Sequence, residues 1–403
     1  MTNHGFAHLN AAGAAMPLPF AQDAVLAHMR EEARVGPHWA ASAAADALDG
    51  TRLAAAQLFG APGPSNIAFG ETATRLWASA LGAMPLHAGA RLLVARCEWG
   101  GNVLNALKLA KAANATVEVV PSDAAGQLDV EALAAMMDER VAAICLPAAS
   151  SGLGVWQPVA AVGKMPRPER CLLFVDTAQA AGRVPIGLDL WNADVVTAPA
   201  RKWLRGPRGQ AALALSDRAL SVLGDPPLLD QAGSVWTGRE RWTTRDDAAR
   251  FEAYEFSAAG RLGFGQALQA ACRDLPTIQA HIGEMLLWMR NRLDDIPGVT
   301  VFEDSAADTA FLTFACKHEQ PAATVARLRR SGVAIATVGL GYARLDFEAR
   351  GLTEVCRVSP HAYTGDGEVL QFLTVLAGGT WPGGEGWDGG TSSIGKGASR
   401  TWI

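Results

Sequence analysis

The chain has 403 residues, of which 49% are hydrophobic and 19% are charged, and its formal net charge is −5. This composition is typical of a folded globular protein and excludes a disordered or fibrous chain. Because positive and negative residues are mixed and no basic block stands out, the sequence disfavours nucleic acid as a partner.

The six cysteines form no C-x-x-C pair, and no His/Cys cluster has zinc-ligand spacing, so no metal site is predicted. They fit buried free thiols in a reducing compartment. The N-terminus lacks a basic segment followed by an apolar one, and no uncharged apolar run approaches the length of a membrane span. We therefore expect a cytoplasmic protein with no membrane partner.

Short apolar runs recur in the first half of the chain, and helical patterns separate them. They are IAF (67–69), RLLVA (91–95), TVEVV (116–120), AAICL (142–146), CLLFVD (171–176), DVVTA (194–198) and AALAL (211–215). Runs of this kind indicate βα units and a mostly parallel sheet. Helices are predicted at 101–113 and 129–137, the second with Asp129 as its N-cap.

The pattern changes after residue 216. A segment rich in Trp, Arg and Thr at 234–247 is predicted to be a loop, and helix follows at 259–294. The remaining elements predict a smaller α+β domain, with strands at 299–304, 309–316, 332–338 and 355–359 and helices at 321–331 and 366–376. The expected organisation is a large domain at 21–258, a small domain made of 1–20 and 259–376, and a disordered tail at 377–403.

The most informative segment is TAPARKWLRGPRG (197–209), which follows an apolar strand and holds one lysine among arginines. An amine that forms an imine must be partly neutral near pH 7, and a neighbouring cation lowers its pKa. Arg201 beside Lys202 suits that role, and an arginine there can also bind a phosphate. The alternative is a solvated basic turn, because charged runs usually face water.

A carboxylate is predicted at the edge of the sheet. Asp176 closes the run CLLFVD, and ligands of open α/β folds bind at the carboxyl ends of the strands. There it could pair with the pyridinium nitrogen of a cofactor and keep the ring an electron sink. Gln179 follows within reach of the phenolic oxygen of such a ring. The alternative for Asp176 is a residue that caps a helix.

Together, D-x-x-Q and the later R-K-W-x-x-G-P-R-G resemble the class V aminotransferase family, and the likeness runs from LNAAG (9–13) to RVSPHAYT (357–364). The family includes cysteine desulfurases, selenocysteine lyases and isopenicillin N epimerase. The resemblance implies the α/β fold of pyridoxal-phosphate (PLP) enzymes of fold type I, with a mostly parallel seven-stranded sheet and a smaller C-terminal α+β domain. It implies PLP as cofactor, Lys202 as the Schiff-base lysine, Asp176 as the pyridinium partner and Gln179 as the contact to the phenolic oxygen.

Other site residues follow from the same resemblance. FGETATRLW (69–77) looks like the turn that cradles the phosphate, with Ala73 and Thr74 at a helix N-terminus. Trp99 stands where the family places a ring stacked on the cofactor, although a tryptophan after a strand is more often packing. Arg357 matches the arginine that binds the substrate's α-carboxylate, for which a guanidinium is suited.

Two positions depart from the family pattern. Pro199 replaces the Ser or Thr that usually gives a hydroxyl to the phosphate, and Ser151 replaces an Asn or Thr near the phenolic oxygen. The segment 250–268 resembles the one that reaches the partner subunit's site, so the resemblance implies a homodimer with shared active sites. His361 receives no role.

The resemblance leaves the reaction open among elimination, transamination and racemisation. Desulfurases carry a nucleophilic cysteine on a mobile loop before the carboxylate arginine, and the corresponding stretch at 337–355 has no cysteine. E-x-G-x-N at 98–102 and the lysine motif resemble hercynylcysteine sulfoxide lyases. We therefore expect a C–S lyase that acts by β-elimination on an S-substituted cysteine or its sulfoxide. The alternatives are an aminotransferase, an epimerase, or a catalytically silent relative that binds a small molecule.

Overall fold

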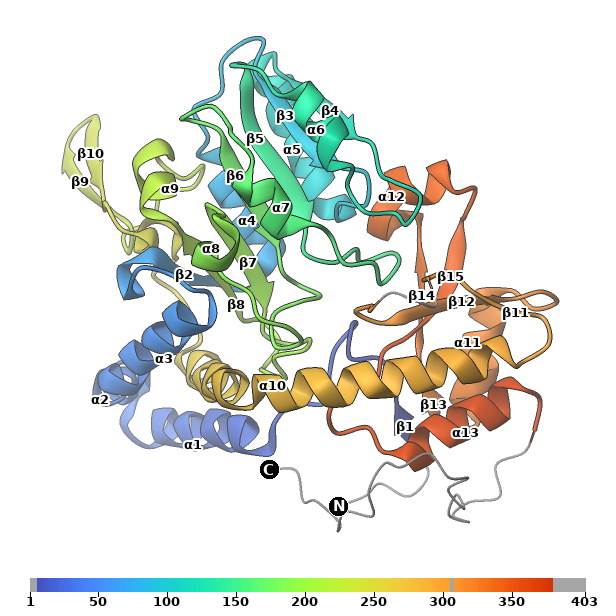
Figure 1. Ribbon diagram of the computed structural model, residues 1–403. Coiled ribbons are helices and arrows are strands. Elements are labelled where there is room, and N and C mark those ends of the chain that lie inside the picture. Colours follow the sequence, from blue (N-terminus) through green and yellow to red (C-terminus); the bar gives the residue numbers. More distant parts are fainter. Residues whose placement is uncertain (1–5, 305–307, 380–403) are drawn as a thin grey trace.

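The large sheet contains the seven predicted strands. In the computed structural model, which describes residues 6–304 and 308–379, they lie in the order β2-β8-β7-β6-β5-β3-β4 (Figure 1). All neighbours are parallel except β8, which runs antiparallel to β7 and β2. Their bounds are β2 Ile67–Gly70, β3 Arg91–Ala95, β4 Thr116–Val120, β5 Val141–Pro147, β6 Leu172–Asp176, β7 Val195–Pro199 and β8 Ala211–Leu215. The mostly parallel sheet is therefore confirmed.

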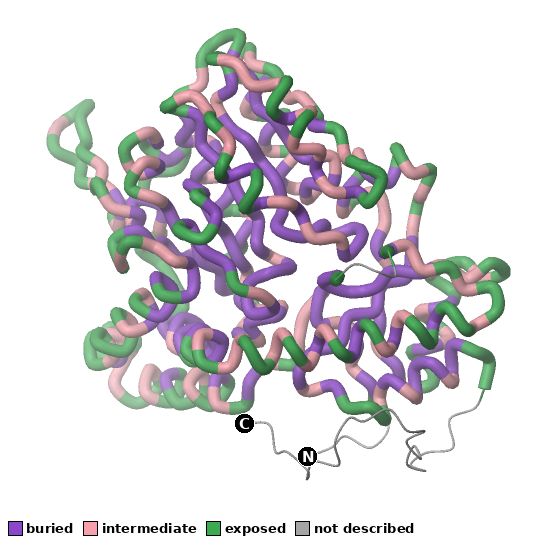
Figure 2. The backbone as a smooth tube through the Cα atoms, in the orientation of Figure 1, coloured by how far each residue is buried: buried purple, intermediate pink, exposed green. Residues whose placement is uncertain are grey.

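Both faces of this sheet are buried. In β6, Leu173 and Val175 join one apolar cluster, whereas Leu172 and Phe174 join the other. This alternation follows from the two-residue period of a strand, and it explains why the run is apolar throughout. Figure 2 shows buried backbone through the middle of the sheet, whereas the edge strand β4 is mostly exposed or half-buried. The helices of this part are α4 Ala73–Gly82, α5 Gly100–Ala113, α6 Val130–Met136, α7 Val159–Lys164, α8 Leu188–Trp191 and α9 Asp217–Val222.

The second half of the chain builds a smaller antiparallel sheet of order β11-β12-β15-β14. Its strands are β11 Val299–Val301, β12 Leu312–Cys316, β14 Ala336–Gly339 and β15 Glu354–Val358, and its flanking helices are α11 Pro321–Arg330 and α13 Asp366–Leu376. Near the N-terminus, β1 Ala7–His8 pairs in parallel with β13 Val333–Ala334. Thus residues 7–8 pair with a strand in the last third of the chain.

One long helix connects the two parts. α10 Ala258–Asp294 has 37 residues, a length of about 55 Å at the usual rise per residue, and runs beneath both sheets (Figure 1). It begins at Ser257, whose side chain accepts a hydrogen bond from the backbone N–H of Gly260. Its first half packs against α1 Pro19–Val35 and α3 Ala45–Leu58, which α2 Pro37–Ala43 joins, and its second half reaches β11 and α13.

The structure corrects one sequence prediction and adds one element. Residues 234–247 contain a hairpin, β9 Ser234–Gly238 and β10 Arg241–Thr244, rather than a loop throughout. The hairpin projects from the molecule, and its residues Val235, Trp236 and Trp242 are exposed (Figure 1). Because neither face is buried, its sequence lacks the alternation of apolar and polar residues that predicts a strand. The stretch 337–355 contains α12 Leu340–Ala349, which the sequence did not reveal. The predicted N-cap Asp129 is confirmed, because its side chain accepts a hydrogen bond from the backbone of Ala132.

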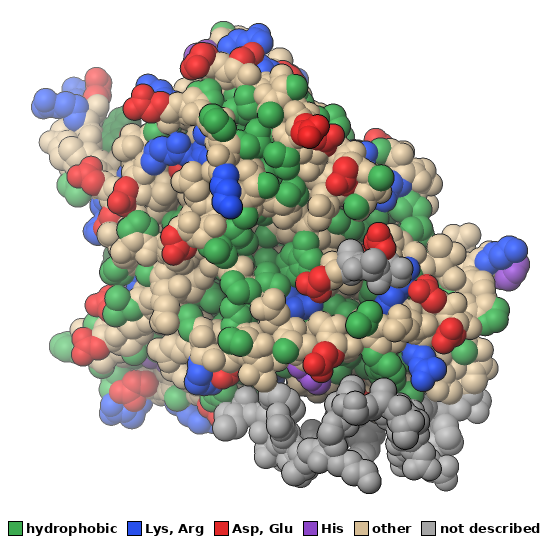
Figure 3. Space-filling model, viewed as in Figure 1, with side chains coloured by type: hydrophobic (Ala, Val, Ile, Leu, Met, Phe, Trp, Pro, Cys, Tyr) green, Lys and Arg blue, Asp and Glu red, His purple; other side chains and the backbone are tan. Residues whose placement is uncertain are grey.

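No helix within the described ranges is long and apolar enough to cross a membrane. The predicted tail from 380 onward lies outside those ranges. On the face shown in Figure 3, hydrophobic side chains gather in the middle above α10, and charged side chains of both signs are scattered around them.

Gly182 packs against the backbone of the residue after Lys202. Gly182 has φ +86°, and a Cβ built on it would lie 2.7 Å from the carbonyl oxygen of Trp203. We expect Gly182→Ala to lower the free energy of unfolding by about 1–3 kcal/mol, because both backbone strain and this clash oppose it. Urea unfolding followed by circular dichroism would measure the effect. Gly283→Ala is the matched control, because a Cβ there meets nothing within 4 Å, and equal losses in both variants would contradict the prediction.

Candidate active site

The candidate residues gather where parallel strands of the large sheet end. Asp176 is the last residue of β6, Lys202 follows the end of β7 by three residues, and Ser151 follows the end of β5 by four. Because β5, β6 and β7 are parallel neighbours, their carboxyl ends share one edge of the sheet. This edge is where open α/β folds bind ligands.

Asp176 is held by two hydrogen bonds and is 7% exposed. Its Oδ1 accepts from the backbone N–H of Ala178 at 2.8 Å, and its Oδ2 accepts from Nδ2 of Asn102 at 3.0 Å. Burial raises the pKa of Asp176, and the charge of Lys202 opposes that shift. The alternative that Asp176 caps a helix is wrong, because a turn follows it at 178–180 and the next helix begins at Leu188.

The amine of Lys202 is affected by one nearby anion and by two nearby cations. Burial lowers the pKa of its amine to about 7; Asp176 opposes the shift, and Arg201 and Arg357 add to it. The sequence argument relied on Arg201, and the structure shows that burial is the larger cause. The segment is not a fully solvated basic turn, because Trp203 and Leu204 are buried and Lys202 itself is half-buried.

The reactivity of this amine follows from its pKa. Below pH 7 the ammonium form dominates and cannot attack an electrophile; above it the neutral amine dominates. We expect labelling of Lys202 by trinitrobenzenesulfonate in the cofactor-free chain to reach half its maximal rate near pH 7. Peptide mapping would measure it, with the exposed Lys164 as internal control. A labelling rate that still rises steeply above pH 9 would contradict the prediction.

Arg357 in β15 lies on the small-domain side of the same site, because its charge acts on Lys202. Its guanidinium is buried, and burial lowers its pKa to about 10. It faces the rings of Phe311 and Tyr342 at 5.3 and 5.7 Å, and its one hydrogen bond within the described chain goes to the carbonyl oxygen of Ser151 at 3.4 Å. Its buried Nε has no partner there. A buried cation with spare donors suits a carboxylate.

Trp99 and the start of α4 lie next to each other. A Cβ built on Gly101 would lie 2.6 Å from Nε1 of Trp99 and 3.3 Å from Cγ2 of Thr74. α4 begins at Ala73, and Thr72 caps it by accepting from the backbone N–H of Arg75. The free N–H groups of this helix start therefore lie beside the tryptophan, an arrangement that suits an anion.

Gln179 and Arg201 tie the N-terminal segment to the lysine loop. Gln179 donates from Nε2 to the carbonyl oxygen of Ala12 at 3.2 Å and accepts at Oε1 from the indole of Trp203 at 2.9 Å. Arg201 is half-buried and donates to the carbonyl oxygen of Gly13. It also lines a cavity of about 510 Å³ with Pro17, Val25, Leu26 and Arg208.

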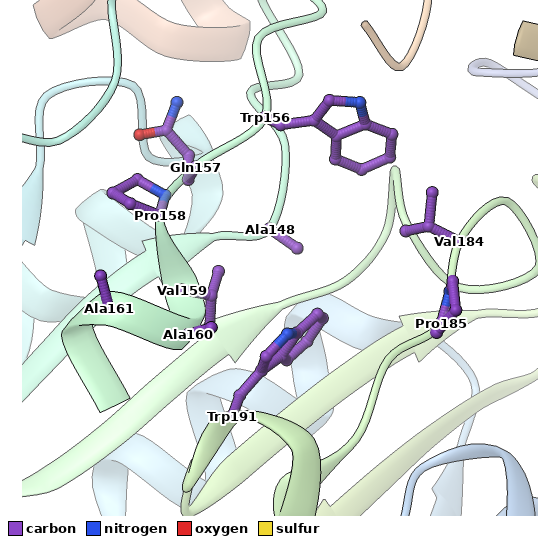
Figure 4. A pocket seen from close by; sticks show the side chains of 10 residues that line it. All are labelled: Ala148, Trp156, Gln157, Pro158, Val159, Ala160, Ala161, Val184, Pro185 and Trp191. Carbon is purple, nitrogen blue, oxygen red and sulfur yellow. The ribbon is translucent and has the colours of Figure 1, made fainter. Parts of the chain in front are cut away.

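A second cavity lies elsewhere. It has a volume of about 260 Å³, and Figure 4 shows Trp156 and Trp191 on opposite sides of it, with Val184 and Pro185 along one wall. None of the candidate site residues lines it. The site is therefore defined by converging polar groups rather than by this cavity.

Three residues at the site received no role from the sequence. Asn102 and Glu98 lie behind Asp176, where the E-x-G-x-N pattern was the signal that could have revealed them. Tyr342 in α12 packs edge-on against Trp99, with ring centroids 5.3 Å apart. No local pattern marks Tyr342, because only tertiary packing places it beside Trp99 and Arg357.

These groups fit PLP, the cofactor that the resemblance implies. Asp176 offers an anion for a protonated ring nitrogen, Lys202 offers an amine that is partly neutral near pH 7 for the aldehyde carbon, and the start of α4 offers N–H groups for the phosphate. Pro199 supplies no hydroxyl, as the sequence predicted. Phosphate binding would therefore rest on α4 and on cations such as Arg201.

Comparisons with known proteins extend over most of the chain. A probable hercynylcysteine sulfoxide lyase from Mycobacterium tuberculosis is 29% identical over 376 residues, covering 93% of this chain and 90% of that protein. A probable cysteine desulfurase from Mycolicibacterium paratuberculosis is 27% identical over 357 residues, 87% of this chain and 51% of that protein, so this chain spans about half its length. The apo structure of a cysteine desulfurase from Thermococcus onnurineus NA1 matches with a TM-score of 0.84 at 19% identity, covering 93% of this chain and 94% of that one.

The structural match confirms the predicted fold class. The model of the family "Aminotransferase class-V" matches residues 8–372, which include every candidate site residue. The chain therefore belongs to the class V aminotransferase family, as the resemblance in its sequence predicted.

Proposed function

We propose that the chain is a PLP-dependent C–S lyase that acts by β-elimination on an S-substituted cysteine or its sulfoxide. The observation that carries this proposal is the convergence of a buried carboxylate, an amine of lowered pKa and a buried guanidinium with spare donors: Asp176, Lys202 and Arg357. When bound, the cofactor supplies an electron sink for the electron pair released at the substrate's Cα.

The chain's own residues then have distinct roles. Arg357 binds the α-carboxylate and orients the substrate. The neutral amine of Lys202 accepts the proton from Cα. The Cβ–S bond breaks, the sulfur leaves with the bonding electron pair, and hydrolysis of the remaining enamine yields pyruvate and ammonia.

The other predicted residues would hold the cofactor. Asp176 would pair with the ring nitrogen, and Trp99 would stack on the ring. Ala73 and Thr74 would bind the phosphate at the start of α4, with Arg201 as an added cation. Ser151 and Gln179 would contact the phenolic oxygen.

The cysteines favour elimination over persulfide formation. Cys356, beside Arg357, is buried in β15 with its Sγ directed to the carbonyl oxygen of Pro321 at 3.6 Å, and burial raises its pKa to about 12. Burial likewise raises the pKa of the other five thiols, Cys97, Cys145, Cys171, Cys272 and Cys316. A thiolate is the nucleophile in persulfide chemistry, so these thiols are poorly suited to it.

Product analysis tests the reaction. We expect the purified protein, loaded with PLP, to release pyruvate from S-substituted cysteines or their sulfoxides. A keto acid that keeps the whole substrate skeleton would indicate an aminotransferase instead, and loss of the Cα proton with racemisation would indicate an epimerase. If added PLP produces no absorption band of a lysine-bound cofactor, the chain is a silent relative and the proposal fails.

We also propose a homodimer in the cytoplasm. Exposed aromatic side chains on the hairpin and the segment after it, Trp236, Trp242, Tyr254 and Phe256, form the kind of surface that a second subunit covers. The six cysteines are free, which suits a reducing compartment. Sedimentation analysis would test the dimer, and a monomer at micromolar concentration would contradict it.

A further inference from the structure

A second carboxyl group lies behind Asp176. Oε1 of Glu98 accepts from the backbone N–H of Trp99 at 2.8 Å and from Nδ2 of Asn102 at 3.0 Å. The same Nδ2 donates to Oδ2 of Asp176 at 3.0 Å. Glu98 is 1% exposed and Asn102 is 2% exposed, so a single buried amide bridges two buried carboxyl groups.

Two buried atoms of this bridge remain without a partner in the described chain: Oε2 of Glu98 and Oδ1 of Asn102. If Glu98 were ionised, both atoms would be acceptors without a donor, which is costly in a buried site. A proton on Oε2 would turn that oxygen into a donor, and Oδ1 of the amide that already donates to Oε1 would be an acceptor for it. A single proton could then satisfy both atoms.

We infer that Glu98 is a neutral carboxylic acid, whose proton binds Oδ1 of Asn102 and fixes the amide so that its remaining N–H donates to Asp176. Glu98 is thus a positioning residue. It orients, through Asn102, the carboxylate that faces the cofactor ring, so its role in catalysis rests on the proposed function.

The charges around the pair place the proton on Glu98 rather than on Asp176. Asp176, from β6, faces the amine of Lys202 and accepts an additional backbone N–H from Ala178. Glu98 faces no cation: burial first and the charge of Asp176 second raise its pKa to about 8. The other titratable groups acting near it are the thiols of Cys97, on the same turn, and Cys145, from β5, and burial keeps both protonated.

A neutral Glu98 leaves Asp176 as the single anion behind the ring nitrogen. An ionised Glu98 would repel Asp176 and compete with it for the amide of Asn102. The role requires an acceptor and a donor at position 98 but no charge. Glutamine supplies both, whereas leucine of similar size supplies neither.

The first test uses the cofactor-free chain. The pKa of Glu98 is about 8 in the folded state, and its ordinary value is 4.5. Between these two pH values, Glu98 takes up a proton when the chain folds. Stability therefore falls as pH rises through that window, and relative to E98Q the unfolding equilibrium constant of the natural chain rises about tenfold per pH unit. Urea unfolding of both proteins at pH 5, 6, 7 and 8 measures the ratio. Parallel pH profiles would overturn the inference.

The second test uses the PLP-loaded protein, with the affinity for PLP and the absorption band of the bound cofactor as readouts. E98L and N102L leave buried donors or acceptors unpaired, and we expect at least about tenfold weaker PLP binding together with a shifted band. E98Q restores both to the values of the natural protein. If E98Q is as impaired as E98L, Glu98 must be ionised and the inference is wrong. If even the natural protein fails to bind PLP, the proposed function fails, while the urea series still decides the state of Glu98.

Discussion

Replacing Lys202 by alanine is expected to lower the rate of pyruvate release at least about 10³-fold. The variant loses the amine that we propose as the acceptor of the Cα proton, and positioned acid–base groups contribute about 10²–10⁴-fold in enzymes. It also loses the cation that, among the described residues, opposes the raised pKa of buried Asp176. A coupled assay of pyruvate with an S-substituted cysteine measures the loss.

Two controls separate this effect from unfolding. Lys164→Ala removes an exposed lysine outside the site and is expected to keep the full rate. Small primary amines added to the Lys202→Ala variant should restore part of the rate, because they can accept the same proton in the vacated space. Undiminished pyruvate release by Lys202→Ala would rule out its role as the base.

Asp176→Asn is expected to lower the same rate by about 10–150-fold, the equivalent of a charge-assisted hydrogen bond of about 1.5–3 kcal/mol. The asparagine keeps the shape but loses the anion that we propose keeps the ring nitrogen protonated. The charge of Asp176 also raises the pKa of Lys202, so the midpoint of Lys202 labelling should move below pH 7 in the variant.

Asp194→Asn is the matched control for this substitution. Asp194 is also a buried aspartate, but it pairs with Arg167 and Arg218 and bonds to the backbone N–H of Leu173, at the opposite end of β6. Its loss should lower stability without moving the absorption band of the bound cofactor. Equal changes of the band in both variants would mean that Asp176 acts only through the fold.

Much of the site could be read from the sequence because the relevant signals are local. Asp176 ends an apolar run that is buried on both faces, and such a run predicts a parallel strand whose last residue lies at the ligand edge. Lys202 follows the next strand in the same way. The pattern of residue types around both positions carried the family resemblance, and with it the cofactor.

Two other features could not be predicted in this way. The hairpin at 234–244 is exposed on both faces, so its strands lack the apolar alternation that identifies a half-buried strand. The bridge from Glu98 through Asn102 to Asp176 depends on how the start of α5 packs against the end of β6.

The sequence by itself determined the parallel sheet, the strand-end carboxylate and the lysine after the next strand, because hydrophobic burial imposes a period on each segment. The resemblance placed Arg357 in the site, but only the tertiary structure showed that its charge, 155 positions after Lys202, lowers the pKa of that amine. The tertiary structure also placed Tyr342 edge-on against the ring of Trp99. It showed that burial lowers the pKa of Lys202 more than the charge of Arg201 does. Desolvation and long-range contact arise from the packing of whole elements, and no short stretch of chain encodes them.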